Sequence, residues 1–116
     1  MDNTKNDQYY IDRLIKDMRF ISAHMTDQTL KSLEANELLQ DSMMFRLVQI
    51  SENSRKLSDD YKEENQQIPW KDMYGLRNRI VHEYGNVDLH IVYDTLVNDI
   101  PWLLKEIEKY DRHTDL

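Results

Sequence analysis

The residues with the clearest chemical potential lie together between Gly75 and Gly85, in the order Gly-Leu-Arg-Asn-Arg-Ile-Val-His-Glu-Tyr-Gly. Within this stretch Arg77, His82 and Tyr84 follow the spacing Arg-x-x-x-x-His-x-Tyr. Histidine titrates near neutral pH and can act as a general base or a general acid. The planar guanidinium of arginine matches phosphate oxygens and stabilises the charge that develops on them. These residue types therefore indicate chemistry at a phosphodiester.

Cleavage of RNA fits these groups best, because the 2′-hydroxyl of RNA supplies the nucleophile and no metal ion is needed. The reaction requires a base for that hydroxyl, an acid for the departing 5′-oxygen and cations around the phosphate. Asn78 could hold His82 in the required tautomer, and Tyr84 could bind the phosphate or stack on a base. The alternative is that His82 and Tyr84 only cap and pack a helix end, beside an ordinary Arg79–Glu83 ion pair.

One helix does not aim Arg77 and His82 at the same atom. Successive helical residues turn by about 100°, so two residues five apart point roughly 140° away from each other. Asn78 and His82, four residues apart, share a face, as do Arg77 and Tyr84. A frayed helix end, the length of the Arg77 side chain, or a second copy of the helix across a two-fold axis could bring Arg77 and His82 together. Two copies would bring two histidines and two arginines to one cleft. We favour this arrangement, a homodimer with the site at the dimer cleft.

The segments that must position these residues are all predicted to be helical. Apolar residues recur at three- and four-residue steps from about Asn6 to Met25, which indicates an amphipathic helix. A second, methionine-containing run steps by fours and threes from Met43 to Tyr61, like the seam of a heptad repeat. We interpret this seam as bundle core that belongs to one long helix, although it could alternatively mediate dimerisation.

The remaining elements are shorter. Between these two runs we expect a connection with a short helical turn. A third helix is predicted to begin with Pro69 at its first position and to run to about Tyr84, where Gly85-Asn86 stops it. A fourth helix is predicted to begin at Asp88 as N-cap, with a kink or a fresh helix start at Pro101. The fold class is thus all-α, a four- to five-helix up-and-down bundle in one domain over residues 1–116, with 110–116 as a frayed tail.

Composition narrows the class of protein further. The chain has no cysteine and a formal net charge of −7, which excludes disulfide chemistry and argues against a general nucleic-acid coat. From Ile68 to Val87, however, three cations outnumber two anions. The sequence lacks an apolar run long enough to span a membrane and lacks a secretory signal core, so we expect a cytoplasmic protein. His82 and His90 are too far apart in sequence to predict a zinc site, and no cofactor is expected.

The segment Ile68-Pro69-Trp70 together with Gly75 to Tyr84 resembles the HEPN superfamily, specifically the HepT-like toxins of toxin–antitoxin pairs. The resemblance extends over Arg46 to Asn53 and over the C-terminal helices, and so covers the whole chain. The segment Ser51-Glu52-Asn53 stands where many relatives carry Gly-Glu-Ala. We expect this difference not to touch the motif.

The resemblance implies a dimerising helical bundle of HEPN type that cleaves RNA without a metal ion in a type VII-like toxin–antitoxin system. By matching position, Arg77 and His82 would be catalytic and Asn78 would support them. It also implies a minimal nucleotidyltransferase as antitoxin, which may transfer AMP from ATP to Tyr84 and so block the site by bulk and charge. A different class of function stays open. The chain could be a non-catalytic helical partner that binds such a nucleotidyltransferase and presents Tyr84 to it.

Overall fold

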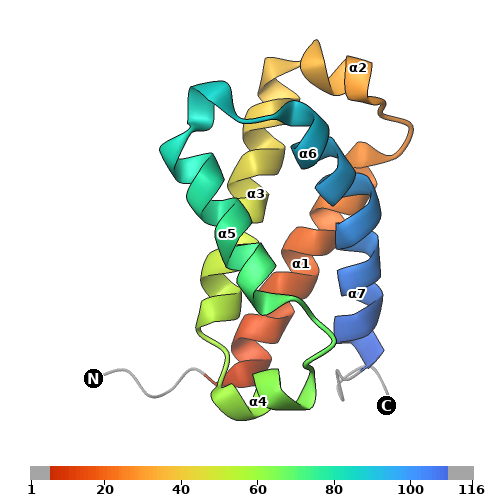
Figure 1. Cartoon of the computed structure of the whole chain (residues 1–116). Helices are drawn as coiled ribbons and strands as arrows, with labels where there is room; N and C mark the ends of the chain where they lie inside the picture. Colours follow the sequence, from red (N-terminus) through yellow and green to blue (C-terminus); the bar gives the residue numbers. More distant parts are fainter. Residues whose placement is uncertain (1–5, 110–116) are drawn as a thin grey trace.

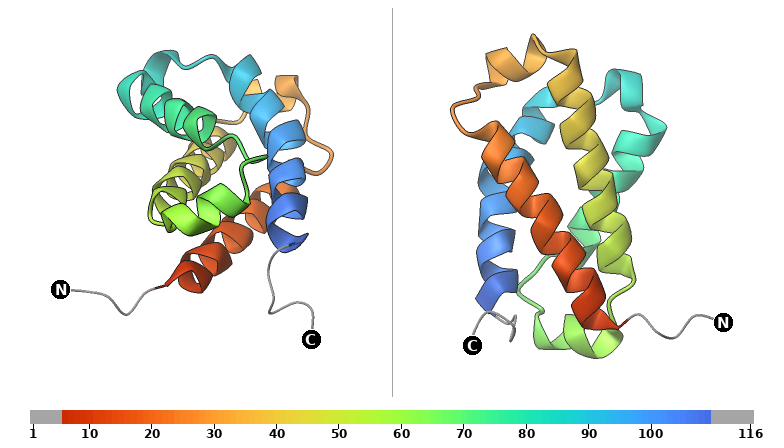
Figure 2. Two further views of the ribbon diagram at one scale, coloured as in Figure 1. Left: turned by 60° about the horizontal axis from the view of Figure 1, so that its bottom comes forward. Right: turned by 180° about the vertical axis from the view of Figure 1, so that it is seen from behind.

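Long helices running up and down the molecule form the framework of the fold (Figure 1). The structure, a computed structural model, describes residues 6–109. Helices α1 (Asp7–Met25) and α3 (Glu37–Arg55) pack side by side along much of their length (Figure 2, right). Helix α5 (Trp70–His82) packs on α3, and α7 (Ile100–Lys109) packs on α1. The predicted all-α bundle is confirmed, and the predicted tail 110–116 lies outside the described residues.

The interface of α1 and α3 is the centre of the hydrophobic core. The apolar face of α1 is buried along the whole helix, as its spacing predicts. The seam predicted from Met43 to Tyr61 is also buried, with exposures of 9% or less at each apolar position. The interpretation of this seam as bundle core is confirmed. The alternative, that it forms a dimer surface, is wrong because these side chains are already covered within one chain.

The single long helix predicted through Tyr61 is interrupted. Helix α3 ends at Arg55, and a short helix α4 (Asp59–Glu64) follows. The break occurs at Ser58, whose hydroxyl accepts from the backbone N–H of Tyr61 at 3.1 Å and caps α4. Both oxygens of the Asp7 carboxylate also bind Ser58, one accepting from its backbone N–H at 2.8 Å and the other from its hydroxyl at 2.6 Å. The helix therefore breaks at Ser58, because of its local cap and its contact with Asp7, although the apolar spacing of the sequence continues to Tyr61.

The connection between α1 and α3 contains the expected short turn, α2 (Leu30–Glu34). Thr29 and Ser32 form a capping box at its start, each side chain accepting from the backbone N–H of the other. The helix α5 begins at Trp70 with Pro69 as its N-cap, one position from the prediction. It ends at His82, two residues before the predicted end, and a 3₁₀ turn, η1 (Tyr84–Asn86), follows.

The C-terminal helical run consists of three parts. Asp88 caps α6 (Leu89–Asp94) by accepting from the backbone N–H of His90 at 2.9 Å, which confirms the predicted N-cap. A π-helical turn, η2 (Thr95–Asp99), then leads into α7. The helical run continues without a break from Leu89 to Lys109, and Pro101 is the second residue after the π-helical turn. The break and fresh helix start predicted at Pro101 are therefore wrong, and the irregularity before Pro101 is a widened helical turn.

The bundle is open along one seam, because α5 and α7 barely contact each other. Among the long helices, α5 packs substantially against α3 only, as Figures 1 and 2 show. Among residues 6–109, no helix is long and apolar enough to cross a membrane. The segment with the Arg-x-x-x-x-His-x-Tyr spacing thus occupies an outer helix of the bundle and the turn that follows it.

Candidate active site

The four residues singled out in the sequence divide between two faces of α5 and the turn that follows it. Arg77 and Tyr84 both bind carboxylates of α3, whereas Asn78 and His82 are exposed. The helical geometry expected from the spacing is therefore present within one chain. The structure brings Arg77 and Asn78 into contact but forms no hydrogen bond from either of them to His82.

Arg77 is fixed by a neighbour from the adjacent helix. Its Nε donates to the Glu52 carboxylate at 2.9 Å, and its Nη1 donates to the Asn78 side-chain oxygen at 3.2 Å. Its remaining nitrogen, Nη2, has no hydrogen-bond partner among residues 6–109. A guanidinium that is anchored through two nitrogens and free at the third can still donate to a phosphate oxygen.

The segment Ser51-Glu52-Asn53 contacts the motif through Glu52, the partner of Arg77. Glu52 is the residue that this segment shares with Gly-Glu-Ala. The two residues that differ, Ser51 and Asn53, form no hydrogen bond with the motif. Glu52 and Arg77 are 25 positions apart in the sequence, so helical periodicity could not show that they form a pair. The one hint in the sequence was that Glu52 matches the glutamate in the Gly-Glu-Ala segment of many relatives.

His82 is the last residue of α5 and is exposed to solvent. Neither ring nitrogen has a hydrogen-bond partner among the described residues. Asn78, which lies one turn earlier, uses its side-chain oxygen for Arg77 instead. In a single chain the imidazole is therefore accessible and not oriented by a neighbour. A second chain or a substrate would have to supply the group that fixes its tautomer.

Tyr84 turns back toward α3 from the 3₁₀ turn. Its hydroxyl donates to the Asp41 carboxylate, while its side chain remains 48% exposed. The hydrogen bond to Asp41, followed by partial burial and by the negative charges of Asp41 and Glu37, raises the pKa of Tyr84 to about 12. The phenol is thus protonated at neutral pH, accessible, and positioned by one carboxylate. No sequence signal pointed to Asp41.

Three large apolar side chains close to these residues are exposed. Phe45 and Leu38 on α3 are 59% and 81% exposed, and Val81 on α5 is 46% exposed. Phe45 lies one helical turn from Asp41, and Val81 precedes His82, so these side chains border the motif on the face where α3 meets α5. Large exposed apolar side chains that share one face commonly mark an interface with another protein.

Among residues 6–109, no three histidine, aspartate or glutamate side chains are arranged to hold a metal ion. The groups available at the motif are therefore a guanidinium, an imidazole, a carboxamide and a phenol, with Glu52 and Asp41 behind two of them. Such a set can bind a phosphate and move protons at it.

Comparison with known proteins agrees with this chemistry. A family model described as "Ribonuclease HepT-like" matches residues 11–110. A relative in Methanocaldococcus jannaschii, whose name marks it as a candidate RNase, is 32% identical over 92 residues, which is 75% of this chain and 84% of that protein. A relative in Thermococcus cleftensis, named as a probable ribonuclease HepT, is 25% identical over 100 residues, covering 86% of this chain and 91% of that one.

A third relative, from Caldanaerobacter subterraneus subsp. tengcongensis, also carries a name that marks it as a candidate RNase. It is 23% identical over 105 residues, which is 90% of this chain and 94% of that protein. No solved structure gives a significant match to the chain.

Proposed function

The chain belongs to the HepT-like ribonuclease family of the HEPN superfamily, and on this premise we propose that it is a metal-independent endoribonuclease with Arg77 and His82 as catalytic residues. The observation that carries the proposal is the combination of an anchored arginine and an accessible histidine on one short helix. Glu52 holds the Arg77 side chain while leaving Nη2 free, and His82 is exposed at the end of the same helix.

The reaction that these groups support is attack of the 2′-oxygen on the adjacent phosphorus. One imidazole takes the proton of the 2′-hydroxyl, the bond from phosphorus to the 5′-oxygen breaks, and a second, protonated imidazole supplies a proton to the leaving oxygen. Arg77 neutralises the charge that builds on the phosphate oxygens. The products are a 2′,3′-cyclic phosphate and a 5′-hydroxyl, and atoms and charge balance without a metal ion.

Two imidazoles require two chains, and a homodimer is part of the proposal. Support comes from the exposed Phe45, Val81 and Leu38, which border the motif where α3 meets α5. Burial of these side chains against their copies would bring the two motifs toward one axis, where His82 of each chain would find the partner that it lacks within its own. Asn78 would support this arrangement by fixing the orientation of Arg77.

The physiological role that we propose is that of a cytoplasmic toxin that cleaves RNA and is neutralised by a minimal nucleotidyltransferase. The exposed hydroxyl of Tyr84 suits a modification site, because its oxygen could attack the α-phosphorus of ATP and release pyrophosphate. The attached AMP would place bulk and negative charge beside the motif and repel RNA. Asp41 would lose its hydrogen bond from Tyr84 in the process.

The direct test is RNA cleavage by the purified protein in EDTA. Wild type should release 2′,3′-cyclic phosphate ends, and Arg77→Ala and His82→Ala should each reduce the rate by about a hundredfold or more. Arg19→Ala and His24→Ala serve as matched controls, since both residues are exposed on α1 and away from the motif. Equal cleavage by wild type, Arg77→Ala and His82→Ala would remove the proposal.

A mixing experiment tests whether the two chains share the site. Heterodimers of wild type with His82→Ala, isolated through two different affinity tags, hold two copies of Arg77 but a single His82. Because the proposed reaction needs one imidazole from each chain, these heterodimers should cleave RNA no faster than His82→Ala itself. Substantial cleavage by heterodimers whose composition is verified by native mass spectrometry would place a complete site on one chain.

The exposed phenol of Tyr84 also favours the second candidate, a non-catalytic subunit that presents this tyrosine to a nucleotidyltransferase. That function predicts tight complex formation and no growth inhibition when the chain is expressed alone. Tyr84→Phe distinguishes the acceptor, since AMP transfer that persists in this variant would exclude Tyr84.

A further inference from the structure

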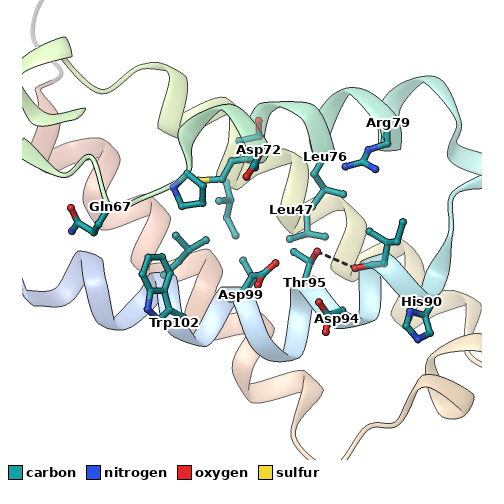
Figure 3. Close-up of a pocket in the computed structure, with 17 residues that line it drawn as sticks. Leu47, Gln67, Asp72, Leu76, Arg79, His90, Asp94, Thr95, Asp99 and Trp102 are labelled. Atoms are coloured by element: carbon teal, nitrogen blue, oxygen red, sulfur yellow. Dashed lines mark hydrogen bonds between the residues drawn. The ribbon is translucent and has the colours of Figure 1, made fainter. Parts of the chain in front are cut away.

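The open seam between α5 and the α6–α7 run contains a cavity of about 720 Å³ (Figure 3). Its floor is apolar and comes from three elements. The residues of the floor are Leu47 and Ile50 on α3, Met73 and Leu76 on α5, and Ile100 and Leu103 on α7. The cavity lies on the side of α5 that carries Asp72, Leu76 and Arg79, whereas the interactions of Arg77 and Tyr84 are with α3. It is therefore a feature separate from the candidate active site.

Three carboxylates surround this floor. Asp72 belongs to α5, and Asp94 and Asp99 lie across the cavity on the other wall (Figure 3). None of them is in an ion pair among residues 6–109, and Asp94 accepts only from the side chain of Asn98 at 2.6 Å. Partial burial, together with the charges of Asp94 and Asp72, raises the pKa of Asp99. Arg79 and His90 also line the cavity. The three carboxylates still outnumber the single guanidinium, so the potential of the cavity is negative on balance.

A buried polar group at the cavity also lacks a partner. Ser51 lines the cavity and is 2% exposed, and its side-chain oxygen forms no hydrogen bond with residues 6–109. Buried hydroxyls are normally paired, because desolvation without a partner costs free energy. The π-helical turn from Thr95 to Asp99 forms part of the same wall, and such turns occur frequently at functional sites. The acidic wall is thus accompanied by an unsatisfied hydroxyl and an irregular helix.

We propose that this seam binds a basic amphipathic helix of a protein partner. The walls are two helices, and the lining positions from Pro69 to Arg79 on α5 span about 15 Å, which is the length of roughly three helical turns. An apolar helix face would cover the floor and fill the open side of the bundle, as in other helix-in-groove complexes. Lysine or arginine side chains on its flanks would pair with Asp72, Asp94 and Asp99.

Other occupants fit these observations less well. RNA would bring phosphates to three carboxylates, so charge repulsion disfavours it. A second copy of this chain has a net charge of −7 and would repel the acidic wall. A small ligand could fill the floor, but Ile91 and Trp102 line the cavity while remaining 41% and 44% exposed. Only a larger partner would also cover these two side chains.

The experiment uses a fluorescent peptide about three to four helical turns long, with leucines along one face and lysines on the flanks. Its affinity for the full chain is measured by fluorescence anisotropy, together with the change in tryptophan emission. A second peptide carries glutamate in place of every lysine. We expect the lysine peptide to bind and the glutamate peptide to bind at least tenfold more weakly.

Variants locate the binding. Asp94→Asn with Asp99→Asn should weaken the lysine peptide roughly tenfold, whereas Asp59→Asn with Asp60→Asn should not. Both double variants change the net charge equally, and Asp59 and Asp60 are exposed on α4. Neutralising carboxylates that repel one another should not destabilise the fold, and thermal unfolding by circular dichroism checks this. Trp102→Ala gives a second, uncharged test and should also weaken binding.

Three results would overturn the proposal. These are equal binding of the two peptides, equal weakening by the two double variants, and saturable competition by a short RNA at the seam. The proposal does not depend on RNA cleavage. Arg77→Ala and His82→Ala should leave peptide affinity unchanged, while the aspartate variants should leave cleavage unchanged. Failure of one proposal is therefore distinguishable from failure of the other.

Discussion

Glu52 gives Arg77 a defined position, and this contact has a role beyond charge balance. An arginine side chain has many rotamers, and a phosphate site benefits from having that freedom removed before the substrate binds. Glu52 and Arg77 are both partly exposed, with side-chain exposures of 38% and 29%. The ion pair therefore contributes little to the stability of the fold. Its value lies in orientation.

Replacing Glu52 should separate these two effects. Glu52→Ala should lower kcat for RNA cleavage by about tenfold, while the free energy of unfolding changes by less than about 1 kcal/mol. Glu52→Gln keeps an acceptor oxygen for Arg77 Nε and should lose less activity. The measurements are single-turnover cleavage and urea unfolding, with Glu63→Ala on α4 as control. A Glu52→Ala variant with full activity would show that Arg77 needs no positioning.

The titration of Tyr84 offers a spectroscopic test of its contact with Asp41. Its pKa of about 12 lies above the ordinary value of a tyrosine. The contact therefore stabilises the fold fully below about pH 10, and the stabilisation is lost as the pH rises toward 12. In an ultraviolet titration of phenolate, Asp41→Asn should lower the pKa of one tyrosine toward 10. The same substitution in a Tyr84→Phe background should shift nothing, and a shift there would assign the effect to another tyrosine.

At the scale of elements, Ser58 joins the start of α4 to the start of α1. It caps α4 with its hydroxyl and donates twice to Asp7. Ser58→Ala should therefore reduce the free energy of unfolding by about 1 kcal/mol in urea denaturation. Ser42→Ala, a serine on α3 that has no hydrogen bond through its side chain within residues 6–109, should change it by much less. Equal effects of the two substitutions would contradict the role of the cap.

Apolar periodicity and cap residues were sufficient to predict most helices. Spacing identified the buried faces of α1 and α3, and Asp88 identified the start of α6. The break between α3 and α4 was missed, because the apolar pattern continues to Tyr61 and the bond from Ser58 to Asp7 spans 51 positions. A contact between residues so far apart in the sequence cannot be predicted from local sequence patterns.

The candidate site shows the same limit. Residue types and spacing singled out Arg77, Asn78, His82 and Tyr84, and helical geometry predicted that Arg77 and His82 diverge. The two carboxylates that bind Arg77 and Tyr84 come from α3 and were not predicted. They depend on the register between α3 and α5, which is set by packing and not by any local pattern.

At the scale of the whole molecule, the proposed dimer can be tested through its exposed apolar surface. Phe45→Glu should convert a dimer to a monomer in sedimentation experiments and remove cleavage, since a charge would have to be buried at the interface. Phe45 is already 59% exposed, so the stability of the monomer should hardly change. Ile91→Glu, at an exposed position on α6 that lines the seam cavity, should remain dimeric. A wild-type monomer at micromolar concentration would contradict the shared cleft.

The open seam also bears on local unfolding. Helix α5 buries only one residue fully, Ile80, whereas α1 buries seven. Among the long helices, α5 packs substantially against α3 only, so it buries little apolar surface. We therefore expect α5 to unfold locally while the rest of the molecule stays folded. Amide hydrogens from Trp70 to His82 should then exchange with solvent well before those of α1 and α3. The candidate site would then lie on an element that opens more readily than α1 and α3, so a substitution such as Ile80→Ala should abolish the proposed cleavage while α1 and α3 stay folded.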